Sequence, residues 1–415
     1  MKKWFLIFVC LSLLFSCRNQ ENSGINPAVI DIEYGMDHVT RLKTSDFGKK
    51  IRYVPLETTD NGLIGSNPII KVLKDFIVVE SQNKCLLFHK EDGHFIAEIG
   101  RPGQGPEEFT GNFSWTDEKE ELLLLQRKPN QLLKFDMKGN FVGNIRFSDP
   151  PGLASSYLFT DSAIIGYFAE RKPANQYVLG IFDKEGILKD TVATLSPLNQ
   201  IIADGITSIS VLRKYENFGH WGASGIILIN YKNDHRQLMV PFAQRIWKNG
   251  DNIRFKEEFV DTIYTVSGNR LVPAIAFHTG KYHISSQEFS SKINTNDRVF
   301  IADISENNDM ILFQCIRGML SDIDSERNGL YTGLFDKQTG EMKIGKNSEP
   351  IEDDLSHFMP FTPMGISSSG EFVSLVESWR VKEWLKDHPE ALSNQKLSFL
   401  TALNEENNPI VVLIE

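Results

Sequence analysis

The stretch LLFHKEDGHFIAEIGRPGQGPEEF, residues 86–109, decides the fold. Its first part is an apolar run that ends at an Asp92–Gly93 turn, and a second apolar run, HFIAEIG, follows directly. Two such runs joined by a turn residue that tolerates positive φ are typical of a β-hairpin. The same order returns in LLKFDMKGNFVGNIRF at 132–147 and in VLGIFDKEGILKDTVA at 178–193.

The hairpins recur at a regular distance along the chain. The turn glycines Gly93, Gly139 and Gly186 are separated by 46 and 47 residues, and two further strands precede each hairpin. Four short strands per unit and a period of 40 to 50 residues are typical of β-propeller blades. Weaker copies with hairpin tips at Gly268 and Gly340 extend the series. The sequence therefore predicts an all-β, six-bladed β-propeller of four-stranded antiparallel blades, spanning residues 50–415.

The two ends of this region predict how the ring closes. KIRYVPLE at 50–57 and NPIVVLIE at 408–415 are strand-like, so we expect the N-terminal strand to be the outer strand of the last blade. Residues 199–235 fit no blade and form either an insertion or a seventh blade, of which we favour the insertion. Residues 378–406 have helical spacing and predict a small helical insert.

The N-terminus predicts export and lipid anchoring. Residues 1–16 contain two lysines and an apolar run, in the layout of a signal peptide. The residues before Cys17 resemble a lipobox, so we expect lipidation of Cys17, with an ordinary cleaved signal peptide as the alternative. Residues 17–49 are then a lipidated tether. The folded body would lie in the periplasm or at the cell surface, attached to a bacterial membrane for which we expect the outer membrane.

Charge and cysteine content narrow the function classes. The net charge is −10 and no basic block is present, which argues against nucleic acid as a partner. Cys85 and Cys315 lie in apolar strand patterns, so we expect buried free thiols rather than a disulfide. We expect a monomer whose partners are the membrane and an unknown envelope protein or small ligand.

Several motifs together resemble a known group of proteins. VPLETTDNGLIG at 54–65, DTIYTVSGNRLVPAIAF at 261–277 and NNPIVVL at 407–413 are similar to motifs of the six-bladed β-propeller lipoproteins of Gram-negative envelopes. The block from Gly93 to Phe109 also resembles an NHL repeat. The resemblance implies a propeller fold and an envelope location, and it brings no catalytic residues with it.

Two loops carry the candidate binding residues. In RPGQGPEEF, the glycines and prolines suit a chain that crosses between blades, and we expect Phe109 to fill the gap there. Crossing alone does not explain Arg101, Gln104, Glu107 and Glu108, so these are ligand-binding candidates on the face that also carries residues 317–329. The glycine-rich loop 217–225 adds His220 and Trp221, and packing is the alternative for both loops.

Catalytic and metal motifs are scarce. The sequence has no P-loop, nucleophile elbow, HExxH or CxxC motif. We predict no cofactor; Asp322, Asp324 and Glu326 form a solvated acidic loop, with a calcium site as the alternative. The leading hypothesis is a non-enzymatic ligand- or protein-binding module. The alternative is an envelope lyase or hydrolase acting on glycan or peptide in the axial channel.

Overall fold

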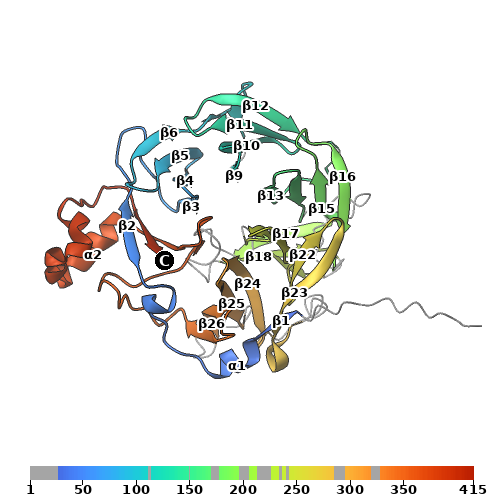
Figure 1. Cartoon of the computed structure of the whole chain (residues 1–415). Coiled ribbons are helices and arrows are strands. Elements are labelled where there is room, and N and C mark those ends of the chain that lie inside the picture. Colours follow the sequence, from blue (N-terminus) through green and yellow to red (C-terminus); the bar gives the residue numbers. More distant parts are fainter. Residues whose placement is uncertain are drawn as a thin grey trace, which may run out of the picture.

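The computed structural model is a six-bladed β-propeller, as the sequence predicts (Figure 1). It describes residues 27–110, 114–148, 150–169, 177–195, 205–212, 226–232, 236–239, 243–284, 295–318 and 328–415. Five blades are four-stranded antiparallel sheets, and blade 4 has a fifth strand. No helix of the described part is both long and apolar enough to span a membrane.

The strands of the first three blades follow one another along the chain. Blade 1 consists of β3 (Ile69–Val72), β4 (Phe76–Ser81), β5 (Lys84–His89) and β6 (Phe95–Glu98). Blade 2 consists of β9 (Ser114–Asp117), β10 (Leu122–Lys128), β11 (Gln131–Asp136) and β12 (Phe141–Arg146). Blade 3 consists of β13 (Ser156–Phe159), β14 (Ile164–Tyr167), β15 (Tyr177–Phe182) and β16 (Leu188–Ala193).

The second half of the ring follows the same scheme. Blade 4 contains β20 (Ile246–Asn249), β21 (Asn252–Phe255), β22 (Thr262–Ser267) and β23 (Arg270–His278). Blade 5 contains β24 (Val299–Glu306), β25 (Met310–Arg317), β26 (Gly329–Asp336) and β27 (Met342–Lys346). Blade 6 contains β28 (Gly365–Ile366), β29 (Phe372–Val376), β30 (Ile410–Ile414) and, as its outer strand, β2 (Ile51–Pro55).

The ring closes through both chain ends, as predicted. Strand β2 pairs with β30 over five residues, from Ile51 opposite Ile414 to Pro55 opposite Ile410. The N–H groups of Lys49 and Lys50 both donate to the carbonyl of Glu415, which extends the pairing to the last residue. Closure in this way puts the N-terminal and C-terminal strands side by side in one sheet and so fastens the ring.

The hairpin glycines adopt the conformation that the sequence predicts. Gly93, Gly139, Gly186, Gly268 and Gly340 all have positive φ, between 58° and 88°. Gly93 is also packed tightly, because a Cβ atom there would overlap the carbonyl oxygen of Pro55 in blade 6. This turn therefore needs glycine both for its backbone conformation and for the approach of β2.

The segment predicted as the end of a tether is instead folded, so that prediction is wrong for residues 28–49. Strand β1 (Ala28–Asp31) pairs in parallel with β23, and helix α1 (Ile32–Asp37) packs against β27. A 3-10 turn at Thr44–Asp46 then leads to β2. The side chains of Ile30, Ile32 and Met36 are at most 4% exposed, so this N-terminal belt is part of the hydrophobic core of the outer rim.

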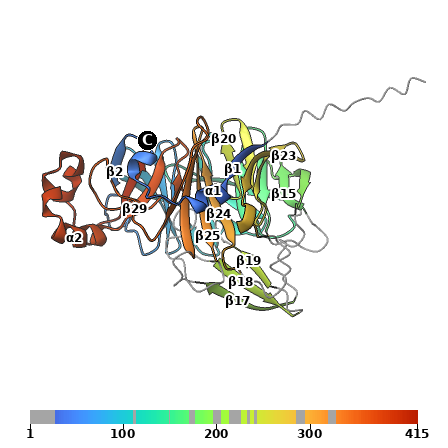
Figure 2. The same ribbon diagram turned by 90° about the horizontal axis from the view of Figure 1, so that it is seen from below.

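Two additions depart from the ring. Strands β17 (Ile206–Leu212), β18 (Ile226–Tyr231) and β19 (Arg236–Met239) form a separate three-stranded sheet on one side of it (Figure 2). This sheet is an insertion between blades 3 and 4 and extends past the predicted end at residue 235. Helix α2 (Ser378–Asp387) and the 3-10 helices Pro389–Ser393 and Gln395–Thr401 form the predicted helical insert, which lies outside the ring beside blade 6 (Figure 1).

Apolar clusters fill the gaps between neighbouring blades. Phe109 is 4% exposed and packs among residues of blades 1 and 2, including Leu87 and Leu123, as the sequence predicts. Cys85 and Cys315 are buried free thiols, also as predicted. Burial of both faces of each sheet between its neighbours explains why the blades are stable only as a ring.

Candidate functional site

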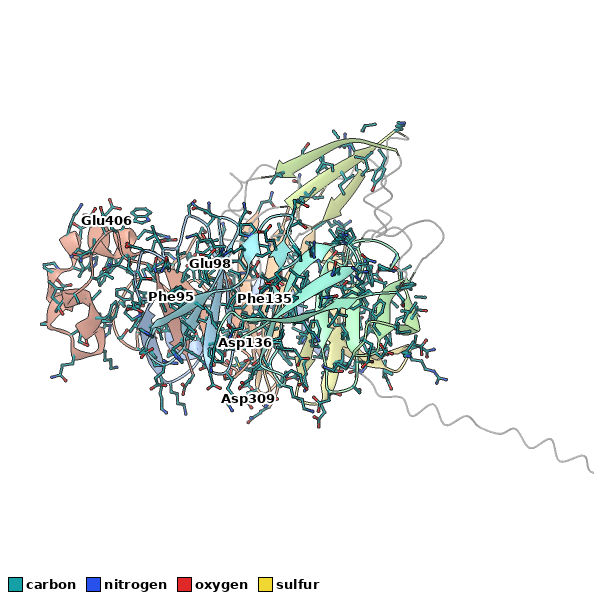
Figure 3. All side chains as sticks on the ribbon, turned by 90° about the horizontal axis from the view of Figure 1, so that it is seen from above. Phe95, Glu98, Phe135, Asp136, Asp309 and Glu406 are labelled. Atoms are coloured by element: carbon teal, nitrogen blue, oxygen red, sulfur yellow. The ribbon has the colours of Figure 1, made fainter. Side chains whose placement is uncertain are left out.

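The connections between strands divide the propeller into two faces. We call the turn face the side with the connections from first to second and from third to fourth strands. The loop face carries the connections from second to third strands and the crossings from one blade to the next. The inserted sheet arises from such a crossing and stands on the loop face, whereas Asp309 lies on the opposite side (Figure 3).

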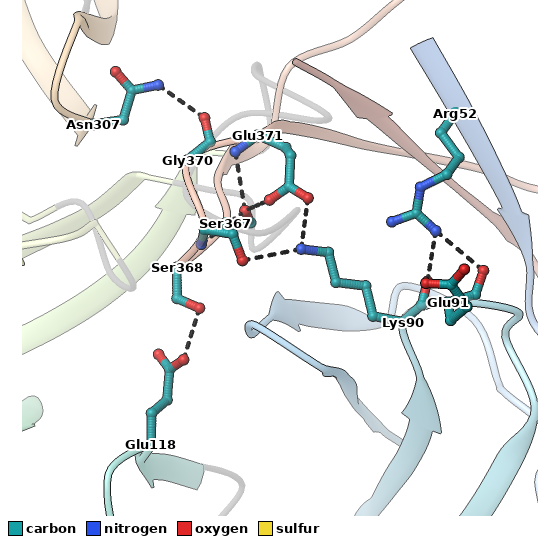
Figure 4. A network of polar contacts seen from close by, with 10 residues as sticks. Arg52, Lys90, Glu91, Glu118, Asn307, Ser367, Ser368, Gly370 and Glu371 are labelled. Atoms are coloured by element: carbon teal, nitrogen blue, oxygen red, sulfur yellow. Dashed lines mark hydrogen bonds and ion pairs between the residues drawn. The ribbon is translucent and has the colours of Figure 1, made fainter. Parts of the chain in front are cut away.

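On the turn face a polar network ties the closing blades together (Figure 4). The ammonium of Lys90 in blade 1 lies 2.6 Å from the carboxylate of Glu371 in blade 6, and both side chains are less than 10% exposed. Asn307 of blade 5 donates to the carbonyl of Gly370, and Ser368 donates to Glu118 of blade 2. Each of these groups is already bonded to a group of another blade. We therefore interpret the network as stabilising the ring and not as a ligand-binding site.

On the loop face, five buried charged residues lie in or near the loop that joins β21 to β22 of blade 4. Arg245 immediately precedes the inner strand β20, Asp303 lies in the inner strand β24, and Lys256, Glu257 and Glu258 follow β21. All five are 6% exposed or less, and they are five of the eleven buried charged residues in the described part. We call this group the axial charge cluster, since two of its members belong to or adjoin innermost strands.

Specific contacts hold the cluster together. Arg245 and Glu258 form an ion pair of 2.5 Å. The carboxylate of Glu257 accepts hydrogen bonds from the Thr194 hydroxyl and the Leu195 N–H, at the point where the chain leaves blade 3 toward the insertion. The cluster is therefore connected to the start of the crossing that carries the inserted sheet.

Two members of the cluster have pKa values near neutrality. Burial raises the pKa of Asp303 to about 7, although the Gln244 N–H and the charge of Arg245 act in the opposite direction. Burial, together with Arg245, lowers the pKa of Lys256 to about 8. The Lys256 ammonium donates only weakly to backbone carbonyls, at 3.3 Å to Ile301 and 3.4 Å to Glu257. Strong pKa shifts of this kind are commoner at functional sites than elsewhere.

The backbone next to the cluster is strained. Phe259 has a φ of 55°, which is unusual for a bulky residue, and its ring packs on Phe300 at 4.7 Å between centroids. Sparsely populated backbone conformations persist where the surrounding structure requires them. The connection between β21 and β22 thus combines buried charge with backbone strain.

The crossing loop at 101–109 has a structure of its own. Strand β7 (Arg101–Pro102) pairs with β8 (Glu108–Phe109), and the Glu108 carboxylate accepts the N–H of Gly105 at 2.6 Å. Arg127 donates to the carbonyls of Pro106 and Gln104. Glu108 therefore shapes the loop, whereas the side chains of Arg101, Gln104 and Glu107 are exposed on the loop face.

The other candidate residues lie outside the described residues. These are His220, Trp221 and the acidic residues Asp322, Asp324 and Glu326. Within the part of the chain that the structure describes, no group of three His, Cys, Asp or Glu side chains could hold a metal ion. The helical insert arises from the loop-face connection between β29 and β30 and lies outside the ring beside blade 6 (Figure 1).

Sequence reasoning missed the axial charge cluster. Its only local signal is the charged triplet Lys256–Glu257–Glu258, placed between Phe255 and Phe259 in a stretch that otherwise reads as strand. A charged triplet is ordinarily a solvated turn. Only the fold shows that Arg245 and Asp303 join it and that all five residues are buried.

Of three solved structures with similarity to this chain, only the first supports the fold. A protein described as an exported protein of Bacteroides fragilis has a TM-score of 0.60 and 18% identity, over 90% of this chain and 97% of its own. A member of the DUF4221 family from Bacteroides vulgatus has a TM-score of 0.43 and 11% identity, over 88% and 96% of the two chains. BamB from Moraxella catarrhalis has a TM-score of 0.27 and 11% identity, over 59% and 68%.

Sequence comparison gives the family. None of the curated protein sequences matches this chain significantly. One family model, a domain of unknown function designated DUF4934, matches residues 27–415. This range begins at the N-terminal belt and ends at the last residue of the ring. The chain therefore belongs to the DUF4934 family.

Proposed function

We propose that this protein is a lipid-anchored module of the bacterial cell envelope that binds a ligand or a protein partner through its loop face. The observation that carries the proposal is the unequal content of the two faces. The loop face bears the inserted sheet, the exposed residues of the 101–109 loop and the axial charge cluster. The turn face bears short hairpins and a network whose charged groups are paired between blades.

The direction of the N-terminal strand supports an orientation for this module. Strand β1 is parallel to β23, with Ala28 opposite Ile275 and Asp31 opposite His278. Because β23 runs from the turn face to the loop face, the chain before Ala28 approaches from the turn face. A lipid on Cys17 would be eleven residues away, which is a reach of at most about 40 Å. In this arrangement the turn face is toward the membrane and the loop face is toward the partner.

The export signal and the comparisons are compatible with this location. Residues 1–16 have the layout of a signal peptide, and the Bacteroides fragilis protein of similar fold is described as exported. Propellers host both enzymes and binding proteins, so the fold alone does not decide between them. The enzyme alternative would need the axial charge cluster to contact a substrate, and all five of its side chains are 6% exposed or less, so we propose binding.

Photo-crosslinking in intact cells tests the binding face. A photoreactive amino acid replaces Gln104 on the loop face or, as a matched control, Gln338 in the turn between β26 and β27; both side chains are exposed. We expect adducts with a discrete partner from position 104 and not from position 338. Adducts only from position 338, or none from any exposed loop-face position of residues 101–109, would contradict the proposal.

A further inference from the structure

The inserted sheet is connected to the ring at the two ends of the insertion. The chain leaves blade 3 at Thr194 and Leu195, directly after β16, and returns at Gln244 and Arg245, directly before β20. Among the described residues, β17, β18 and β19 pair with one another and with no strand of a blade. The place of this sheet on the loop face therefore depends on how its two ends are held (Figure 2).

Glu257 holds the end at which the chain leaves blade 3. One oxygen of its carboxylate accepts the Thr194 hydroxyl at 2.5 Å, and the other accepts the Leu195 N–H at 2.7 Å. Glu257 itself belongs to blade 4, in the loop after β21, and is 1% exposed. Hydrogen bonds to an ionised acceptor are stronger than bonds between neutral groups. Two consecutive residues at the start of the insertion are thus fixed by one carboxylate of another blade.

Asp303 holds the end at which the chain returns. Its carboxylate accepts the Gln244 N–H at 2.9 Å from strand β24 of blade 5. The Lys256 N–H donates to the carbonyl of Arg245 at 3.0 Å, and the Arg245 guanidinium pairs with Glu258 at 2.5 Å. The last residues of the insertion are therefore fixed by blade 5 and by the loop after β21, which also carries Glu257.

Burial of several charged groups costs stability, and apolar residues of similar size would often cost less. What a buried carboxylate supplies is a defined geometry, because its two oxygens bind donors in fixed directions. We propose that Glu257 and Asp303 are positioning residues for the loop face. By fixing both ends of the insertion, they set where the inserted sheet stands relative to the 101–109 loop.

The two carboxylates give the loop face a fixed shape. A partner that contacts both the inserted sheet and the 101–109 loop meets two surfaces whose separation is set before it binds, so it does not have to order them. This consequence for binding rests on the function proposed above. The position of the sheet is measured without any partner, so the two proposals can fail separately.

The test measures the distance between the sheet and the ring in the full chain. Spin-labelled amino acids replace Ile209 in β17 and Val142 in β12, which are 60% and 51% exposed, and pulsed electron resonance gives the distribution of distances between the labels. Glu257→Ala and Asp303→Ala should each widen this distribution at least twofold. Glu257→Gln and Asp303→Asn keep an acceptor oxygen and should retain the wild-type distribution. An unchanged distribution in either folded alanine variant would overturn the proposal.

Glu306 provides the matched control. It is a buried carboxylate three residues after Asp303 in the same strand, but it accepts from Trp247 and pairs with Lys337 at the turn-face end. Glu306→Ala should destabilise the protein and leave the distance distribution unchanged. An equal widening in Glu306→Ala would overturn the proposal, because general loosening of the ring would then explain the effect.

A milder variant covers the case in which an alanine variant does not fold. Glu257→Asp keeps the charge but shortens the side chain by one methylene group, so that the carboxylate no longer reaches both Thr194 and Leu195. We expect a distribution wider than that of wild type, with circular dichroism showing that the protein is folded. A wild-type distribution in folded Glu257→Asp would overturn the proposal.

Discussion

The ammonium of Lys90 lies 2.6 Å from the carboxylate of Glu371 and joins blade 1 to blade 6, the blade that contains both the N-terminal strand β2 and the C-terminal strand β30. Both groups are withdrawn from water, and Glu371 also accepts a hydrogen bond from the Ser367 hydroxyl. A buried ion pair at the closing seam makes the stability of the ring depend on both partners being present.

Removal of one partner should therefore be costly. We expect Lys90→Met to lower the free energy of unfolding by about 3–5 kcal/mol, because Glu371 is left as an uncompensated buried charge. The double variant Lys90→Met/Glu371→Leu should recover most of this loss. Denaturant unfolding measures both, and Lys119→Met, which breaks the exposed pair with Asp161, is the control without a measurable effect. A double variant as unstable as the single one would contradict this account.

The Lys90–Glu371 pair also predicts that the stability of the protein decreases at acid pH. Burial opposes ionisation of Glu371, but Lys90 and Ser367 together lower its pKa below the ordinary value of 4.5. A lowered carboxyl pKa contributes stability above pH 4.5 that is lost as the pH falls through the folded-state pKa. We expect the unfolding free energy of the wild type to decrease relative to that of the double variant as the pH falls below 4.5. A difference that is constant from pH 3 to pH 7 would contradict it.

The raised pKa of Asp303 predicts the opposite trend, a stability that decreases as the pH rises. Its pKa is about 7 in the folded state and 3.8 in the unfolded reference, so the folded state retains the proton longer and stability falls as the pH rises between these values. Asp303→Asn keeps an acceptor for the Gln244 N–H and removes the titration. We expect the variant to gain on the order of 3 kcal/mol relative to wild type between pH 4 and pH 7.5. Parallel stability curves for the two proteins over that range would show that Asp303 does not titrate there.

Two hairpin glycines separate backbone strain from packing. Gly93 and Gly268 both have positive φ, but only Gly93 lies against a neighbouring backbone carbonyl, that of Pro55, and the space around Gly268 is open. We expect Gly268→Ala to cost about 1 kcal/mol through strain alone. Gly93→Ala should cost about 2 kcal/mol more, because β2 must move away. Equal losses in thermal unfolding would mean that the seam accommodates the extra methyl group.

In the crossing loop 101–109, we expect Glu108 to stabilise the loop and the exposed Arg101 to have no structural role. Glu108→Ala leaves the Gly105 N–H without its acceptor and should lower the unfolding free energy by about 1 kcal/mol. The exposed Arg101 makes Arg101→Ala the matched control, with no measurable effect on stability. If instead both variants are as stable as wild type, the carboxylate of Glu108 does not shape the loop.

Much of the ring could be predicted because its signals are local. The turn glycines mark each hairpin, and the strands at 50–57 and 408–415 close the ring where their sequences suggest. The N-terminal belt could not be predicted, since β1 and α1 are only four and six residues long and are stabilised by β23 and by Ile344 of β27. Short elements that depend on distant partners leave no periodicity in the sequence.

The candidate site was harder to predict for the same reason. The 101–109 loop is visible as a motif, yet the structure uses Glu108 to form the loop and leaves Arg101, Gln104 and Glu107 exposed. The axial charge cluster brings Arg245 and Asp303 together from different blades, and no linear spacing relates them. A propeller builds such groupings by closing the ring, so they appear only when the blades are in place.

The lipid on Cys17 is the claim on which the proposed location and orientation depend. Intact mass spectrometry of the full protein purified from its native membranes tests it directly. We expect a mature chain that begins at Cys17 and carries a diacylglyceryl group on the thiol. A chain that begins at another residue, or an unmodified Cys17, would contradict the anchored arrangement.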